Sequence, residues 1–115
     1  MRIIAGKAKG YNIQVPQGEV RPTQDRVREA LFNILHPILN GARILDLFCG
    51  SGSVGLEALS RGAASVRMVD AAKQSCAMAR KNLEKSKLIG GSVVQSDCLQ
   101  FVKRDAGKYD IIFAD

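Results

Sequence analysis

The stretch DLFCGSGSVG, at residues 46–55, carries the residues best suited to chemistry. Gly50, Gly52 and Gly55 follow the spacing G-x-G-x-x-G, which is typical of a turn that binds an adenosine-containing cofactor. Because glycine has no Cβ, such a turn can bend sharply and let a ligand approach its backbone. Asp46 stands just before the turn, where dinucleotide-binding turns usually carry no carboxylate. The stretch therefore predicts a cofactor site that contains an acid.

Elements that could position this turn follow from Gly41 onward, where apolar strands alternate with helical segments. The predicted strands span residues 43–47, 65–69, 92–95 and 109–114, and the predicted helices span 54–60, 73–85 and 99–102, with Gly62 as a cap. This alternation predicts an α/β fold of Rossmann type, with a parallel, doubly wound sheet.

Four aspartates come at or just after the ends of the four predicted strands: Asp46, Asp70, Asp97 and Asp115. In a parallel sheet the ligand lies beyond the carboxyl ends of the strands. One acid in such a place could be a helix cap, but four in the same relative position predict one site.

The first 22 residues are predicted to form a hairpin-like arm, and residues 23–115 a cofactor-binding domain that begins with a helix. Thr23 is the expected N-cap of that helix. His36 precedes Pro37 and is expected to end it, because the residue before proline disfavours helix. The apolar face is expected to comprise Val27, Ala30, Leu31, Ile34 and Leu35.

The acids help to distinguish between two cofactors. Asp70 can accept the two ribose hydroxyls of either NAD or S-adenosylmethionine. Asp46 would repel the pyrophosphate of NAD, whereas it would stabilise the sulfonium and ammonium groups of S-adenosylmethionine. Asp97 can accept from the exocyclic amine of adenine. The residues favour S-adenosylmethionine, with an NAD-dependent oxidoreductase as the alternative.

Composition narrows the class of protein. The chain has 115 residues and a net charge of +6. Cys49, Cys76 and Cys98 form no C-x-x-C pair and His36 is the only histidine, so we expect reduced thiols and no metal site. No apolar run approaches the ~18 residues of a membrane span, and a cytoplasmic protein is predicted.

Positive charge is concentrated in two places, which suggests an acidic partner. The first 28 residues contain Arg2, Lys7, Lys9, Arg21, Arg26 and Arg28 against only Glu19 and Asp25. A second cluster comprises Lys73, Arg80, Lys81, Lys85 and Lys87.

Three segments resemble a known family. The run RILDLFCGSGSVGLEALSRGA (43–63) resembles motif I of the class I methyltransferases. RIIAGKAKG (2–10) and RPTQDRVREALFNIL (21–35) resemble the N-terminal segments of the bacterial small-subunit ribosomal RNA guanine-N2 methyltransferases, the RsmD family. The resemblance extends over essentially the whole chain.

The resemblance implies S-adenosylmethionine as the cofactor and small-subunit ribosomal RNA as the partner, with no membrane. The cofactor-binding residues that it implies are Thr23, Arg26, Asp46, Phe48, Gly50, Ser51, Gly52, Asp70, Asp97 and Cys98. Basic residues near the N-terminus would hold RNA phosphates: Arg2, Lys7, Lys9, Arg21 and Arg28. Helix capping remains the alternative for Thr23, and surface charge for Arg21 and Arg26.

The final segment, YDIIFAD (109–115), resembles the strand that leads into the catalytic motif of the family, an Asp or Asn followed by Pro-Pro and an aromatic residue. Asp115 would accept a hydrogen bond from the guanine amine. Because the sequence shows only the first residue of the motif, we expect an incomplete enzyme that does not methylate RNA by itself. A binding module without catalysis is the alternative, and the modified nucleotide, guanine-N2 against adenine-N6 specificity and the oligomeric state stay open.

Overall fold

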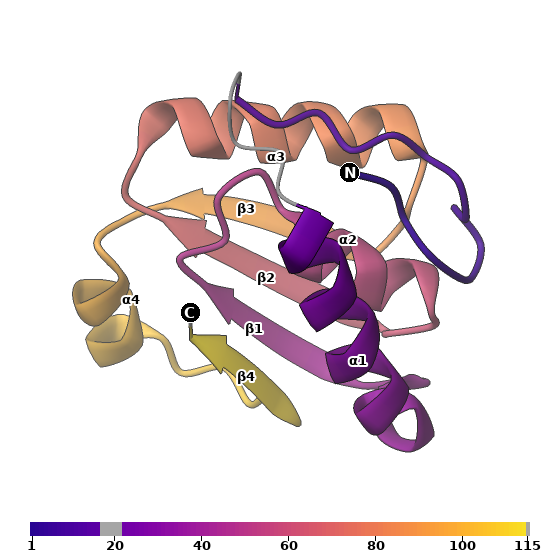
Figure 1. Cartoon of the computed structure of the whole chain (residues 1–115). Helices are drawn as coiled ribbons and strands as arrows, with labels where there is room; N and C mark the ends of the chain where they lie inside the picture. The colour runs from indigo at the N-terminus through magenta and orange to yellow at the C-terminus, as the bar shows by residue number, and fades with distance from the viewer. Residues whose placement is uncertain (17–21, 115) are drawn as a thin grey trace.

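Four parallel strands form one sheet, in the order β3-β2-β1-β4 (Figure 1). The computed structural model describes residues 1–16 and 22–114, with residues 22–24 described by their backbone alone. The strands are β1 (Arg43–Leu47), β2 (Ser65–Asp70), β3 (Gly91–Gln95) and β4 (Ile111–Ala114). The predicted α/β fold with a parallel sheet is thus confirmed, although β4 begins two residues later than residue 109.

Helices cover both faces of this sheet. They are α1 (Pro22–Leu39), α2 (Ser53–Ser60), α3 (Lys73–Ser86) and α4 (Cys98–Arg104). Successive side chains of β1 point to opposite faces: Ile44 packs with residues of α1, α2 and α3, whereas Leu45 and Leu47 pack with residues of α4. One face of the sheet is therefore covered by α1, α2 and α3, and the other face by α4.

Helix α2 ends in a tight turn that two backbone hydrogen bonds close. The N–H of Gly62 donates to the carbonyl of Leu59 at 3.1 Å, and that of Ala63 donates to Ala58 at 3.0 Å. These two bonds form a Schellman motif, which needs a left-handed residue after the cap. Gly62 supplies it with φ +112°, as the sequence predicts.

Helix α1 differs from its prediction in both of its ends. It begins at Pro22, so Thr23 lies within the first turn and not at the N-cap. Proline suits the first helical position because its φ is fixed and its missing N–H would have no helical partner there. At the other end the helix continues through His36 and Pro37 to Leu39. Pro37 gives up one helical hydrogen bond, and the buried Leu39 anchors the last turn in the core.

The predicted apolar face of α1 is correct only in part: Leu31 and Leu35 are half-buried, with Leu35 packed against the core, whereas the other three residues are exposed. Val27 is 62% exposed and Ile34 is 77% exposed. The buried face instead carries Arg28, Phe32 and Leu39. The ring of Phe32 lies 5.9 Å from that of Phe113 on β4, which fixes which side of α1 faces the sheet.

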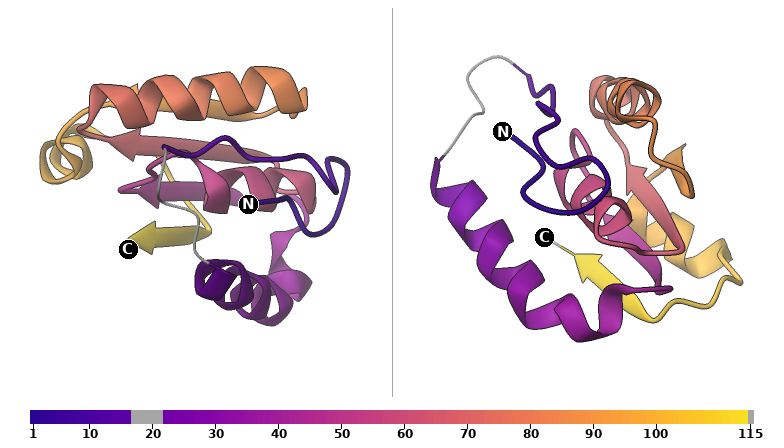
Figure 2. Two further views of the ribbon diagram at one scale, coloured as in Figure 1. Left: turned by 45° about the horizontal axis from the view of Figure 1, so that its top comes forward. Right: turned by 90° about the vertical axis from the view of Figure 1, so that its right-hand side faces the viewer.

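The N-terminal arm is an irregular hairpin that packs on α2 and α3 (Figures 1 and 2). An isolated antiparallel bridge joins Arg2 to Asn12. Ile3 and Ile13 are buried against Leu56 of α2. Within the described ranges, none of the helices has the length and apolar character that crossing a membrane requires.

Candidate cofactor-binding site

The glycine-rich turn connects β1 to α2 and has a left-handed backbone at two glycines. Gly50 has φ +55°, and Gly52 has φ +90° at the N-cap of α2. A Cβ on Gly50 would meet no atom of the described chain within 4 Å, so the turn is open on that side. A Cβ on Gly55 would lie 2.7 Å from Sδ of Met68, so its absence lets α2 pack against β2. The glycines thus shape both the opening and the helix behind it.

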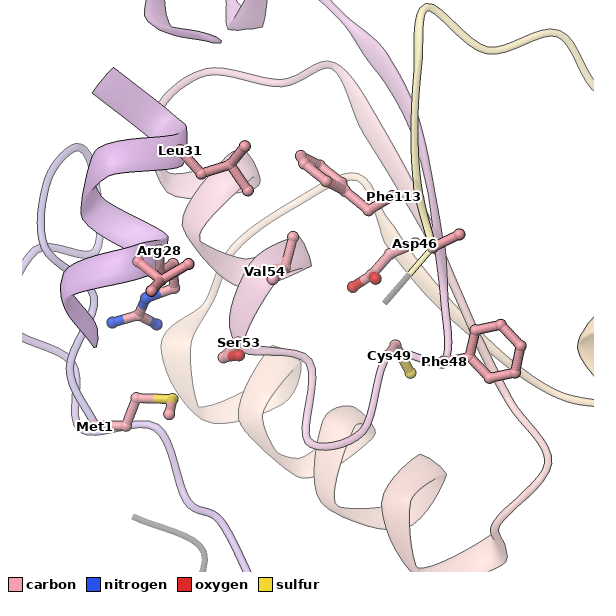
Figure 3. Close-up of a pocket in the computed structure, with 11 residues that line it drawn as sticks. Met1, Arg28, Leu31, Asp46, Phe48, Cys49, Ser53, Val54 and Phe113 are labelled. Carbon is pink, nitrogen blue, oxygen red and sulfur yellow. The ribbon is translucent and has the colours of Figure 1, made fainter. Parts of the chain in front are cut away.

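Phe48 stands out within the turn. It has φ +58°, a left-handed conformation that is strained for a bulky residue, and its side chain is 56% exposed. Figure 3 shows its ring pointing away from Asp46 and Ser53. An exposed aromatic ring held by a strained backbone at a cavity edge is typical of a functional position.

The acids that the sequence places at strand ends lie along one edge of the sheet. Asp70 accepts from the backbone N–H of Gly50 through Oδ2 at 3.0 Å and from that of Ala72 through Oδ1 at 2.9 Å. Asp97 caps α4 by accepting from the N–H of Gln100 at 3.0 Å. Each carboxylate oxygen has a second lone pair, so these contacts leave acceptors for a ligand.

A cavity of about 440 Å³ opens beside the turn, between α1, the end of β1, the start of α2 and β4 (Figure 3). Asp46 lines it and is only 3% exposed. Its lining comprises Met1, Val27, Arg28, Leu31, Asp46, Phe48, Cys49, Ser53, Val54, Phe113 and Ala114. The cavity therefore combines apolar walls with one buried acid and one buried cation.

Arg28, which the sequence predicts at RNA phosphates, is buried in the wall of this cavity. Its side chain is 4% exposed. One nitrogen, Nη2, donates to the carbonyl of Arg2 and to Oδ1 of Asp25 at 3.3 Å. Nε lies 3.9 Å from Oε1 of Glu57. The side chain thus connects α1 to the arm and to α2.

Several buried polar side chains hold the arm in place, among them Glu57 and Asn82, which the sequence analysis missed. Glu57 accepts from the N–H groups of Ile4 and Ala5 at 2.9 and 3.2 Å, and from Nε of Arg61 at 2.8 Å. It stands on a helix whose other central residues are apolar, and a lone acid in such a place is a signal of a buried partner.

Asn82 links the arm directly to the glycine-rich turn. Its Oδ1 accepts from the hydroxyl of Tyr11 at 3.1 Å and the N–H of Gln14 at 2.9 Å. Its Nδ2 donates to the carbonyls of Gln14 and Ser51 at 2.9 and 3.0 Å. An asparagine on the inward stripe of α3, beside Cys76 and Ala79, was the signal available in the sequence.

The remaining predicted residues are distributed as follows. Arg2, Lys7 and Lys9 are exposed on the arm, and Arg26 is exposed on α1. Arg21 and the predicted catalytic Asp115 lie outside the described residues, as does the side chain of Thr23.

The three cysteines are free and buried. Burial raises the pKa of Cys49, and Asp46 and Asp70 raise it further; burial also raises the pKa of Cys76. Such thiols stay protonated and are poor nucleophiles. The Sγ of Cys98 donates to the carbonyl of Val69 at 3.7 Å. Within residues 1–16 and 22–114, no group of three or more His, Cys, Asp or Glu residues is placed to hold a metal ion.

A parallel sheet in this order, with an open glycine turn after β1 and acids at the neighbouring strand ends, is the core of the class I methyltransferase fold. The chain belongs to the family described as Conserved hypothetical protein 95, whose model matches residues 1–115. This confirms the resemblance to the RsmD family that the sequence analysis identified.

Individual relatives agree with this family. Ribosomal RNA small subunit methyltransferase D of Escherichia coli K12 is 40% identical over 116 residues, which cover 100% of this chain and 59% of that protein. The solved structure of yhhF from Escherichia coli superposes with a TM-score of 0.89 at 41% identity, over 97% of this chain and 61% of that one. A SAM-dependent methyltransferase from Agrobacterium tumefaciens gives 0.68 at 30% identity, over 81% and 31%. The chain thus spans about three-fifths of the curated relative's length.

Proposed function

We propose that this chain forms the cofactor-binding part of a cytoplasmic methyltransferase that uses S-adenosylmethionine to methylate the N2 amine of a guanine in small-subunit ribosomal RNA. The observation that carries the proposal is the open turn at Gly50 flanked by Asp46, Asp70 and Asp97. These acids stand at or just past the carboxyl ends of adjacent parallel strands. The names and folds of the relatives support the same activity.

The residues present fit this cofactor. The open side of Gly50 leaves room for a ligand at the backbone, and Asp70 beside it has acceptors for ribose hydroxyls. Asp97 and the backbone of Cys98 would frame the adenine, while Phe48, Ser51 and Gly52 would line the methionine side. When bound, the cofactor supplies an electrophilic methyl group on a sulfonium.

The charge of the cavity argues against NAD. Asp46 is almost fully buried at its wall. A dinucleotide would bring its pyrophosphate against this carboxylate in a region of low dielectric, where like charges repel strongly. A sulfonium and an ammonium group would instead be attracted to it. The methyltransferases among the relatives point the same way.

The basic arm supports RNA as the substrate. Arg2, Lys7 and Lys9 are exposed on one short hairpin, where they could neutralise phosphates and release counterions. Enzymes that modify a base flip it out of its stack and read it in a pocket. In the proposal, Asp115 accepts the N–H of the guanine amine and turns the lone pair of the nitrogen toward the methyl group. Catalysis then depends mainly on alignment, which can lower a barrier by about 7–11 kcal/mol.

Calorimetric titration of the chain with S-adenosylmethionine, with NAD as the control ligand, tests the proposal. We expect binding of S-adenosylmethionine that is lost in Asp70→Ala, and no heat with NAD. Asp110→Ala is the matched control, because Asp110 lies at the opposite edge of the sheet, where it accepts from the N–H of Arg43 at 2.8 Å. Binding of NAD alone would overturn the proposal, as would equal weakening by both substitutions.

A further inference from the structure

The net positive charge of the chain comes from two segments, the arm and α3. Residues 1–16 and 73–87 contain eight Lys and Arg residues against one acid, whereas the rest of the chain has nine against ten. The basic residues of α3 and its C-cap are Lys73, Arg80, Lys81, Lys85 and Lys87. None of them lines the cofactor cavity. Charge of one sign in two segments forms one binding surface only if the segments meet in the fold.

The arm and α3 do meet, along one side of the helix. Asn82 of α3 accepts through Oδ1 from the hydroxyl of Tyr11 and from the N–H of Gln14, both on the arm. Ala8 of the arm and Leu83 of α3 pack against the same apolar cluster. Figures 1 and 2 show the arm running beside α3. The basic residues of the two segments therefore share one region of the surface.

Helical spacing places Lys81 and Lys85 on the side of α3 nearest the arm. Residues three or four apart are neighbours on a helix surface, so Lys85 adjoins both Lys81 and Asn82, which holds the arm. Arg80 instead faces the edge of the sheet, since its Nη2 donates to the carbonyl of Val93 on β3 at 3.3 Å. We call Lys81 and Lys85 the α3 ridge.

The lysines of this region have no acid within the described chain to neutralise them. Lys81 and Lys85 are exposed, as are Lys7 and Lys9 on the arm. None of these four side chains forms an ion pair with a described residue, and neither does Glu84, the one acid on α3. Like charges one helical turn apart repel each other, so an acidic partner would be attracted to the α3 ridge and would relieve this repulsion.

We propose that the α3 ridge and the arm together bind the sugar-phosphate backbone of RNA, at a stretch away from the nucleotide that is methylated. This inference rests on the proposed function and extends its RNA contact from the arm to α3. Lysine suits the task because its ammonium group acts as a point charge toward phosphate. Contacts to phosphate fix the position of a nucleic acid without reading its sequence. The α3 ridge would therefore contribute affinity and orientation, and no sequence specificity.

The outward side of α3 favours RNA over an anionic membrane. Helices that lie on membranes turn an apolar face toward the lipid. All exposed residues of α3 are polar or charged except Ala77, whereas Cys76, Ala79 and Leu83 pack inward. A surface that offers charge without an apolar face suits the phosphates of a nucleic acid.

The salt dependence of RNA binding tests the inference. The probes are a hairpin of small-subunit ribosomal RNA and an RNA duplex of unrelated sequence. Each phosphate contact contributes about 0.7–0.9 to the slope of log K against log salt concentration. The double variant Lys81→Gln, Lys85→Gln should therefore reduce the magnitude of the slope by about 1.4–1.8 for both probes. Its affinity for S-adenosylmethionine should stay unchanged, because neither lysine lines the cavity.

The double variant Lys103→Gln, Arg104→Gln is the matched control. It removes the same charge from two exposed residues at the end of α4, which covers the opposite face of the sheet. We expect it to keep the wild-type slope. An equal fall of the slope in both double variants would show an effect of net charge alone and would overturn the inference.

The remaining outcomes separate this inference from the proposed function. If the chain bound S-adenosylmethionine and RNA, and the slope were unchanged by replacement of Lys81 and Lys85, only the inference would fail. Failure of the unchanged chain to bind either RNA would contradict RNA as the substrate and this inference with it. If the replacement abolished binding to vesicles of anionic phospholipid and left the RNA slope unchanged, the surface would be a membrane contact and the inference would be wrong.

Discussion

Acidic side chains at the two edges of the sheet have different partners. Near the amino ends of the strands, Asp110 pairs with Arg43 at 3.4 Å and Asp105 pairs with Arg67 at 3.4 Å. At the carboxyl edge, Asp70 and Asp97 accept from backbone N–H groups and form no ion pair with a described residue.

This difference separates acids that form ion pairs within the fold from the acids that we propose to bind the cofactor. A backbone N–H satisfies a carboxylate oxygen but cancels none of its charge, so the carboxyl edge keeps a negative potential that a cationic ligand can use. A paired arginine cancels the charge within the protein. Glu57 belongs with the paired acids, although it is buried, because Arg61 and Arg28 both approach it.

The largest effect that tests this distinction is expected at Glu57. Glu57→Ala leaves Arg28 and Arg61 buried without their shared acid and removes the acceptor of the N–H groups of Ile4 and Ala5. Breaking a buried ion pair in this way costs about 3–5 kcal/mol, to be measured by urea unfolding. Glu84→Ala, on the exposed side of α3, is the control and should change stability little. If Glu57→Ala lowered the free energy of unfolding by less than about 1 kcal/mol, the ion pairs of Glu57 would contribute no more than exposed pairs do.

A smaller loss of stability is expected for Asn82→Ala, because Asn82 is uncharged and supports the carboxyl edge of the sheet through hydrogen bonds alone. Asn82→Ala leaves backbone groups of Gln14 and Ser51 without their partner. Such a loss costs about 1–3 kcal/mol, and the affinity for S-adenosylmethionine should fall with it, because Ser51 lies in the turn.

Tyr11→Phe is the matched control for Asn82. It removes only the hydroxyl that donates to Oδ1 and leaves the bond from Nδ2 to Ser51. We expect a cost of about 0.5–1.5 kcal/mol and unchanged ligand affinity. Equal loss of affinity in both variants would show that the arm, and not the Ser51 contact, affects the turn.

The smallest effect concerns the exposed acid Asp110. Hydrogen bonds from the backbone and then the side chain of Arg43 lower the pKa of Asp110. The folded pKa therefore lies below the unfolded one, so the stabilisation is present above about pH 4 and is lost as the pH falls through the folded value. The difference in unfolding free energy between the wild type and Asp110→Asn should shrink as the solution is acidified.

Arg43→Ala sharpens this test, because it keeps the backbone N–H that contributes most to the shift. It should retain most of the pH dependence. If the unfolding free energies of the wild type and Asp110→Asn differed by the same amount at every pH, pairing with Arg43 would not stabilise the charged form of Asp110.

Most of the fold could be predicted because it depends on local patterns. β1 occupies the predicted residues 43–47, and α2 and α3 differ from their predicted bounds by one residue at one end each. Apolar runs bounded by glycine define such elements, and the parallel connection follows from their alternation. The placement of Asp46, Asp70 and Asp97 at one edge followed in turn, since parallel strands bring their carboxyl ends together.

The errors occurred on α1, where local patterns allow two answers. One stripe comprises Val27, Ile34 and Ile38, which are all exposed in the structure. The other carries Arg28 among apolar residues, and an arginine normally counts against burial. Burial of Arg28 depends on Asp25 nearby and on two partners from distant segments, Glu57 and the carbonyl of Arg2.

The sequence by itself determined the strands, the glycine turn and the line of acids, because each depends on residues close together in the chain. Tertiary structure alone decided which face of α1 turns inward, how Asn82 holds the turn, and that Arg28 lies in the cavity beside Asp46. The physical reason is that a buried charge or amide is stable only with its partners in place. Those partners come from elements that are distant in sequence and meet only when the sheet and its helices assemble.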